Sequence, residues 1–267
     1  MNLYHLGDEP VTARLNLKRE LRRLRQDTMS PLLGILQDEE SLYLHGDVGR
    51  YVQAFEFFYL SAERCLHNTS VGTRYHRQVT PSLGGGRRLS VRQRRLAREF
   101  SSRAPFFRVD LVNLLVHSRV LLDRIIALSR RFLVGPRLPS FSSFAEHKRF
   151  FHKYPDAFSP QHSPYSRYIR DETAWFDIPV KAIRDKIVVH PGPRHFQFIT
   201  YPSEHDMGIL LAMDARRPWT DHPQASSVRF SARRTLCNVW RFLEWYNRYA
   251  MSAVRGTGVP AIDSHGI

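Results

Sequence analysis

Apolar residues recur along most of this chain at intervals of three and four, the spacing that places them on one face of an α-helix. Leu17, Leu21 and Leu24 follow this spacing in the first predicted helix, over residues 15–26. The strongest pattern spans residues 107–135, where a wide apolar face is formed by Leu111, Leu114, Leu115, Leu121, Leu122, Ile125 and Leu128. We therefore predict a mainly α-helical protein with this segment in its core.

The remaining pattern predicts further helices and one pair of strands. Helices are expected over residues 47–68, with Asp47 as the N-cap, 90–103, 142–154, 178–190 and 231–251. Alternating apolar residues over 195–201 and 206–213 predict a small β-hairpin before the last helix. Residues 67–89, rich in Gly, Ser, Thr and Arg, predict an exposed excursion between helices, and Pro105 is expected to open the helix that follows it.

Composition places the chain among globular proteins. It has 267 residues, of which 42% are hydrophobic and 24% charged. Its apolar runs are far shorter than the ~18 residues that a membrane span requires, and its first residues resemble neither a secretory signal nor a transit peptide. We expect a cytoplasmic protein with no membrane partner. Cys65 and Cys237 are expected to be buried thiols in a reducing compartment, with a disulfide or a nucleophile as the alternatives.

Charge changes this picture, because 40 basic residues against 25 acidic ones leave a formal charge of +15. Such an excess favours an anionic partner, nucleic acid first. Only five of the basic residues are lysines, and the other 35 are arginines. A GC-rich genome would produce the same bias, so compositional drift remains the alternative explanation.

One short segment carries most of the candidate chemistry. Arg184 is followed by Asp185 and, six positions after the arginine, by His190, which closes a predicted helix immediately before Pro191. This arrangement resembles the motif of the HEPN superfamily, small helical bundles that include metal-independent ribonucleases. Residues 118–132 are similar to an earlier core helix of such bundles, especially those of toxin–antitoxin and abortive-infection systems.

The helical geometry of the motif is compatible with a site, although its two residues do not share a face. Six steps of about 100° turn the His190 side chain about 120° away from the direction of Arg184. A working pair therefore needs His190 displaced at the helix end, which Pro191 favours, or a second copy of the motif. The resemblance implies the second copy, because HEPN nucleases are typically homodimers.

The resemblance also implies the catalytic roles. His190 would transfer a proton at the ribose 2′-hydroxyl or the leaving oxygen, Arg184 would stabilise charge on the scissile phosphate, and Asp185 would orient one of them. The alternative is a solvated charged turn in which His190 caps the last carbonyls. Glu56 and Asp123 are candidate partners of Arg184, or members of structural ion pairs.

Other motifs are weak. The GGG at 84–86 is followed by Arg87 and Arg88 rather than by Lys and Ser or Thr, so it is not a phosphate-binding loop. No histidine or cysteine spacing indicates a metal site, so we expect no cofactor and no metal. The basic run contains the predicted RNA-binding residues: Arg87, Arg88, Arg92, Arg94, Arg95 and Arg98. The alternatives are a solvated helix face or a contact with an acidic antitoxin.

We accordingly expect a single domain over residues 1–267, made of an N-terminal helical extension (1–46), a HEPN-like bundle (47–192), and the hairpin with a closing helix (193–267). The expected function is a metal-independent RNA endonuclease, a toxin or phage-defence effector, acting as a homodimer on RNA and controlled by an antitoxin or regulatory protein. The alternatives are a non-catalytic HEPN-like module that binds RNA or a protein, and a basic scaffold without a site.

Overall fold

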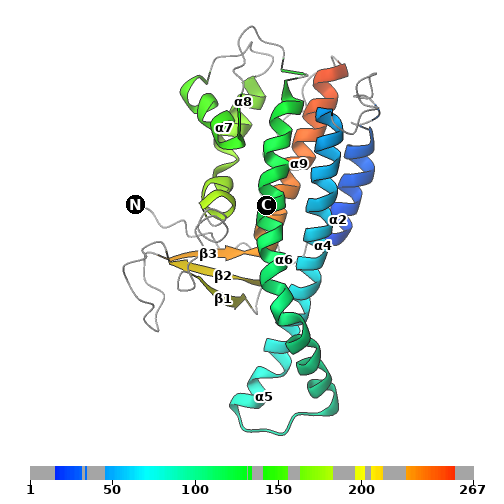
Figure 1. Ribbon diagram of the computed structural model, residues 1–267, viewed down its shortest axis with the longest axis vertical. Helices are drawn as coiled ribbons and strands as arrows, with labels where there is room; N and C mark the ends of the chain where they lie inside the picture. Colours follow the sequence, from blue (N-terminus) through cyan, green and yellow to red (C-terminus); the bar gives the residue numbers. More distant parts are fainter. Residues whose placement is uncertain are drawn as a thin grey trace.

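Two long antiparallel helices form the axis of the molecule (Figure 1). They are α4 (Asp47–Gln78) and α6 (Val91–Ser129). The computed structural model describes residues 16–31, 34, 46–130, 132–133, 141–155, 163–182, 196–201, 206–212 and 227–255. Within these residues the protein is mainly helical, which confirms the predicted class.

The main core lies where α2 (Leu17–Arg23), its π-helical continuation η1 (Leu24–Met29) and α9 (Ala232–Arg255) pack against the long pair (Figure 1). The predicted apolar faces are buried in it. Leu17, Leu21 and Leu24 are at most 2% exposed, and so are the seven residues named above for the strongest helix. Burial of these stripes is the main stabilising contribution to the fold.

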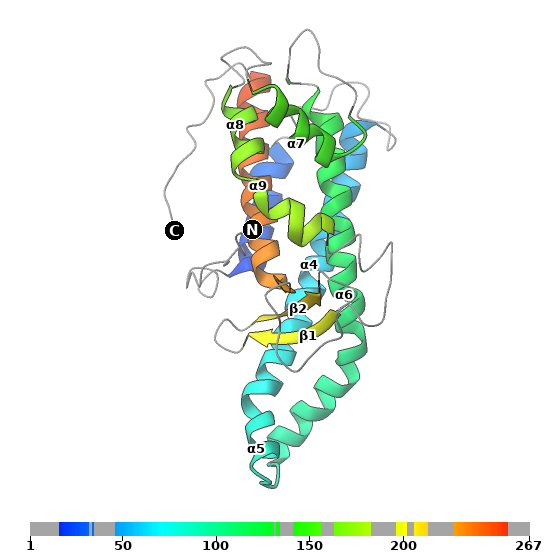
Figure 2. The ribbon, with the colours of Figure 1, turned by 90° about the vertical axis from the view of Figure 1, so that its left-hand side faces the viewer.

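The α7 (Phe144–Lys153) and α8 (Ser163–Asp171) helices and the π-helical turn η4 (Phe176–Ala182) cover another side of α6 and α9 (Figures 1 and 2). A buried polar cluster joins these layers. The Ser129 hydroxyl lies 3.0 Å from the hydroxyls of both Tyr165 and Tyr246, and His147 Nε2 lies 3.0 Å from the Tyr165 hydroxyl. The aromatic core is therefore also a hydrogen-bonded one, which gives the layers a specific registration.

A three-stranded antiparallel sheet lies beside the middle of the long pair (Figure 1). Its order is β1 (Phe196–Tyr201), β2 (Asp206–Ala212) and β3 (Ser227–Ser231), with Phe196 opposite Leu211 and Gly208 opposite Ser231. The first two strands fall within the two segments whose residues alternate. The hairpin itself stays a prediction, because residues 202–205 are not among those described. The sequence pattern did not predict β3, which leads directly into α9.

Three local predictions are wrong. The α4 helix runs through most of the expected excursion at 67–89, and α5 (Thr80–Gly84) follows it. Pro105 lies inside α6 rather than opening a second helix; the residues around it are exposed, so water can bind the carbonyl that loses its N–H partner. Asp47 is the first helical residue, and Gly46 is the N-cap.

Candidate nucleic-acid interface

The end of the α4–α6 pair projects beyond the rest of the molecule and is closed by α5 (Figures 1 and 2). It has a small core of its own. The rings of Tyr75 and Phe100 stack there with centroids 4.2 Å apart, beside three buried side chains: Val71, Val79 and Leu96. This projection, residues 71–100, is therefore a folded helical tip rather than an open loop.

Gln93 holds the turn of the helical tip together. Its backbone and side chain form a capping box with Ser90 at the start of α6. Its amide nitrogen also donates to the Gln78 carbonyl at 2.6 Å and to the Ser82 hydroxyl at 2.9 Å. The Gln93 side chain therefore links α4, α5 and α6. The arginines of residues 87–98 are held on an ordered backbone by these contacts.

All six predicted RNA-binding arginines lie on the helical tip and are exposed: Arg87, Arg88, Arg92, Arg94, Arg95 and Arg98. None of the six forms an ion pair within the part of the chain that the structure describes. The first acid after them, Glu99, instead lies 3.6 Å from Arg103 and 3.9 Å from Arg74. The tip therefore carries a local excess of positive charge that its own acids leave uncompensated.

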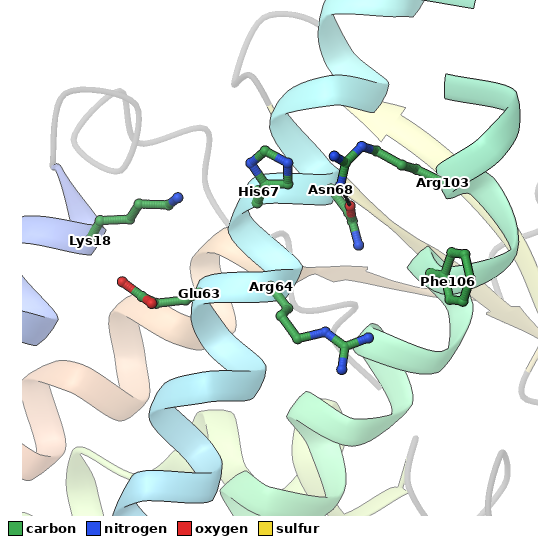
Figure 3. A pocket seen from close by; sticks show the side chains of 7 residues that line it. All are labelled: Lys18, Glu63, Arg64, His67, Asn68, Arg103 and Phe106. Carbon is green, nitrogen blue, oxygen red and sulfur yellow. Dashed lines mark hydrogen bonds between the residues drawn. The ribbon is translucent and has the colours of Figure 1, made fainter. Parts of the chain in front are cut away.

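A pocket of about 490 Å³ opens where the helical tip joins the body (Figure 3). Seven residues line it: Lys18, Glu63, Arg64, His67, Asn68, Arg103 and Phe106. Lys18 comes from α2, the next four from α4, and the last two from α6. Three full cations against one carboxylate make this lining predominantly basic.

A buried relay positions both arginines that line the pocket. The Asp110 carboxylate, 1% exposed, forms an ion pair with Arg64 Nη2 at 2.8 Å and accepts a hydrogen bond from the Asn68 side-chain amide at 2.5 Å. The Asn68 carbonyl oxygen in turn accepts from Arg103 Nη1 at 3.3 Å. A carboxylate and an amide inside the helix pair therefore hold one guanidinium from α4 and one from α6 at the surface.

His67 reports the electrostatic character of the pocket. Its pKa lies below the usual value, first because partial burial disfavours the charged imidazole and then because Arg103 and Lys18 repel a proton. His67 is therefore neutral at pH 7. Its ring can accept or donate one hydrogen bond there without adding a charge.

The predicted catalytic residues Arg184, Asp185 and His190 lie outside the described residues, as does Pro191. The structure describes the chain up to Ala182, the last residue of η4.

The two acids considered as partners of Arg184 each contact other residues in the described part of the chain. Glu56 lies 2.8 Å from Arg25 Nη2. Asp123 accepts from Arg119 Nε at 3.0 Å and from the Phe144 backbone N–H at 2.7 Å. Both acids thus form ion pairs with nearby arginines, and the hydrogen bond from the Phe144 backbone also ties α6 to the start of α7.

Two features were sought in the described part of the chain, a metal-binding group and a membrane-spanning helix. No group of three or more His, Cys, Asp or Glu side chains there could hold a metal ion. Nor does any helix within the described ranges combine the length and apolar character that crossing a membrane demands. Cys65 and Cys237 are both buried and are not joined in a disulfide, as predicted.

Comparison with known proteins adds no relative: no family model, no curated protein and no solved structure matches this chain.

The pocket and its relay were not identified from the sequence. Asp110 is a single acid within an apolar helical run, and this was the only available signal. Arg64, Asn68 and Arg103 look like ordinary helix-surface residues in the sequence. Their proximity depends on the register between two helices whose residues are 35 or more positions apart.

Proposed function

We propose that this protein binds RNA and that the helical tip is its main contact. The observation that carries the proposal is the set of six arginines exposed on a folded projection, none of which forms an ion pair with another described residue. Lysine and arginine side chains that neutralise phosphates release condensed counterions, and this release is the main source of affinity for nucleic acid. The choice of RNA over DNA follows the resemblance of the Arg184–His190 segment to HEPN proteins.

Compositional drift explains these arginines less well than binding does. A bias in codon usage would distribute arginines over the surface, where acids could pair with them, as Glu244 pairs with Arg248 at 2.7 Å. On the helical tip, however, six arginines occur within twelve residues and before the first acid. A cluster of this kind attracts a polyanion and is costly without one, because like charges repel.

The test compares two variants that lose the same charge. Arg87, Arg88, Arg94 and Arg95 change to Gln in the first. The control changes Arg23, Arg25, Arg170 and Arg248 to Gln, all of which form ion pairs in the structure. Affinity for a labelled single-stranded RNA is measured by fluorescence anisotropy over a salt series.

The tip variant should bind more weakly whatever the RNA sequence, and its salt dependence should flatten by roughly 0.7 log units for each phosphate that the protein no longer neutralises. The control should retain most of the affinity and slope. Equal losses in both variants would mean that net charge alone attracts RNA. Unchanged binding in the tip variant would remove the interface from the helical tip.

A second function, metal-independent RNA cleavage, is favoured by the spacing of Arg184 and His190 and by Pro191 directly after the histidine. In this proposal the protein is a homodimeric toxin or defence effector, His190 moves the proton of the 2′-hydroxyl, and Arg184 stabilises the charged phosphate. Cleavage should survive excess chelator, leave a cyclic phosphate and fail on RNA with a 2′-deoxy scissile position. Cutting that stops with chelator, or that proceeds equally on DNA, would contradict this mechanism.

A further inference from the structure

We propose that the pocket between α4 and α6 is a nucleotide subsite for single-stranded RNA, in which Arg64 and Arg103 contact a phosphate and the Phe106 ring stacks on a base. This inference rests on the proposed RNA binding and adds the form of the substrate. Three features support it: two pre-positioned guanidinium groups, an exposed aromatic ring beside them, and a basic helix face that leads to the tip.

The guanidinium groups are held before any ligand arrives. Arg64 is fixed by the buried Asp110 carboxylate, and Arg103 is fixed through the Asn68 amide that binds the same carboxylate. Both side chains nevertheless remain accessible, at 60% and 40% exposure. Because the relay restricts their rotamers, contact with a phosphate costs less conformational entropy than for free surface arginines.

Phe106 provides a stacking platform rather than core packing. It is 55% exposed and lines the pocket, whereas its neighbour Phe107 is 5% exposed and belongs to the main core. A large apolar ring in water beside cations is unfavourable unless something covers it. Bases of single-stranded RNA stack on such rings while their phosphates contact nearby arginines, and the stacking tolerates any sequence.

The pocket also continues the basic surface of the helical tip. By helical spacing, Arg92, Arg95 and Arg103 lie within about 80° of one another around α6. Glu99 lies on the same face, but its carboxylate already contacts Arg103 and Arg74. A strand bound along this face would therefore pass from the tip to the pocket over mostly cationic surface.

Glu63 is the one acid among the residues that line the pocket. The direction of its side chain is compatible with a phosphate bound in the pocket. The Glu63 carboxylate accepts from the Tyr59 hydroxyl at 3.0 Å and lies 3.5 Å from Arg22. It extends toward α2, whereas Arg64 extends toward α6 and Phe106 (Figure 3). The carboxylate is thus neutralised on the far side of the pocket from the proposed stacking position.

The experiment separates base stacking from charge by using two probes. One is a fluorescein-labelled 15-nucleotide single-stranded RNA with 2′-O-methyl groups, which a 2′-hydroxyl mechanism cannot cut. The other is a polyphosphate chain of similar charge, which has no bases. Affinities are measured for the wild type, Phe106→Leu, Arg103→Gln and the matched control Phe57→Leu, whose ring is 48% exposed but does not line the pocket.

Phe106→Leu should weaken RNA binding about 5-fold or more, because the variant cannot stack on a base, and should leave polyphosphate binding unchanged. Arg103→Gln should weaken the binding of both probes, and Phe57→Leu should change neither. All three side chains are substantially exposed, so the variants should fold like the wild type.

Two results would overturn the subsite while leaving the proposed function intact. In the first, Phe106→Leu binds RNA normally although the tip variant with four Arg→Gln changes does not. In the second, Phe106→Leu lowers the sedimenting mass of the protein without affecting RNA, which would make the ring a contact between two copies of the chain. If the wild type binds neither probe, both the subsite and the proposed function fail.

Discussion

The side-chain amide of Asn68 donates a 2.5 Å hydrogen bond to the carboxylate of Asp110 and so joins α4 to α6 inside the molecule. Asp110 is 1% exposed and Asn68 9% exposed. A buried carboxylate is tolerated only when hydrogen bonds and an opposite charge compensate for its lost hydration. Asn68 and Arg64 supply that compensation, so the stability of the helix pair depends on an exposed arginine as well as on a buried amide.

Arg64→Gln should therefore destabilise the protein more than its exposure suggests. Removing the guanidinium leaves the Asp110 carboxylate buried without its counter-charge, which should cost about 2 kcal/mol, less than breaking a fully buried ion pair because Arg64 is 60% exposed and Asn68 still donates to the carboxylate. The matched control is Arg74→Gln, whose partner Glu99 is 36% exposed and 3.9 Å away, and which should change the free energy of unfolding by less than about 1 kcal/mol. Urea unfolding measures both. Equal effects of the two substitutions would show that the Asp110 relay is not a stabilising contact.

The buried His147 predicts a specific dependence of stability on pH. Burial, together with the charge of Arg130, lowers its pKa to about 3 from the ordinary 6.5. The unfolded chain therefore takes up a proton near pH 6.5 while the folded protein does not, and the contribution to stability is complete above that pH. It is lost as the pH falls from about 6.5 towards 3, by up to about 1.4 kcal/mol per pH unit.

The measurement is the free energy of unfolding between pH 7.5 and 5 for the wild type, His147→Phe and the exposed His152→Gln. The Phe variant should show the flatter profile, because its side chain cannot take up a proton in the unfolded state. Its absolute stability will also change, since the hydrogen bond to Tyr165 is removed, so only the slope is diagnostic. Parallel profiles for the wild type and His147→Phe would mean that the imidazole is not shielded from protons in the native state.

Both thiols should resist alkylation in the native protein. Cys65 is 0% and Cys237 2% exposed, and burial raises the pKa of the Cys237 thiol. The thiolate is the reactive form, so both inaccessibility and protonation slow the reaction. Iodoacetamide at pH 8 should add less than one label per chain without denaturant and two in guanidinium chloride, as counted by mass spectrometry. Rapid double labelling of the native protein would disprove the burial of these side chains.

The proposed cleavage depends on His190 and Arg184 rather than on the helical tip. His190→Ala and Arg184→Ala should each lower RNA cleavage by about 100-fold or more, because proton transfer and charge stabilisation contribute at least that much. The helical circular-dichroism signal should be unchanged and the loss of stability should be about 1 kcal/mol or less. The control is the tip variant, whose cleavage of saturating RNA should fall much less. Unfolding of either alanine variant would assign the residue to the structure of the fold.

Periodicity was sufficient for elements with one apolar face. Leu17, Leu21 and Leu24, and the strongest stripe from Leu111 to Leu128, are buried as their spacing predicts. It failed over residues 67–89, where Gly, Ser and Thr favour a loop by local propensity. There the stacking of Tyr75 on Phe100 and the bonds of Gln93 stabilise helix instead, an effect of long-range packing that a local pattern does not contain.

The sequence by itself determined the helical class, the buried stripes, the burial of both cysteines and the concentration of arginines before Glu99. Only the tertiary structure decided that these arginines stand on a folded projection, and that Arg64, Asn68, Arg103 and Asp110 meet around one pocket. The physical reason is that charge and periodicity are properties of a segment, whereas a site depends on the register between segments. In this protein the register between α4 and α6 brings the four side chains together. That register is fixed by the shared core and by buried hydrogen bonds between residues far apart in the chain.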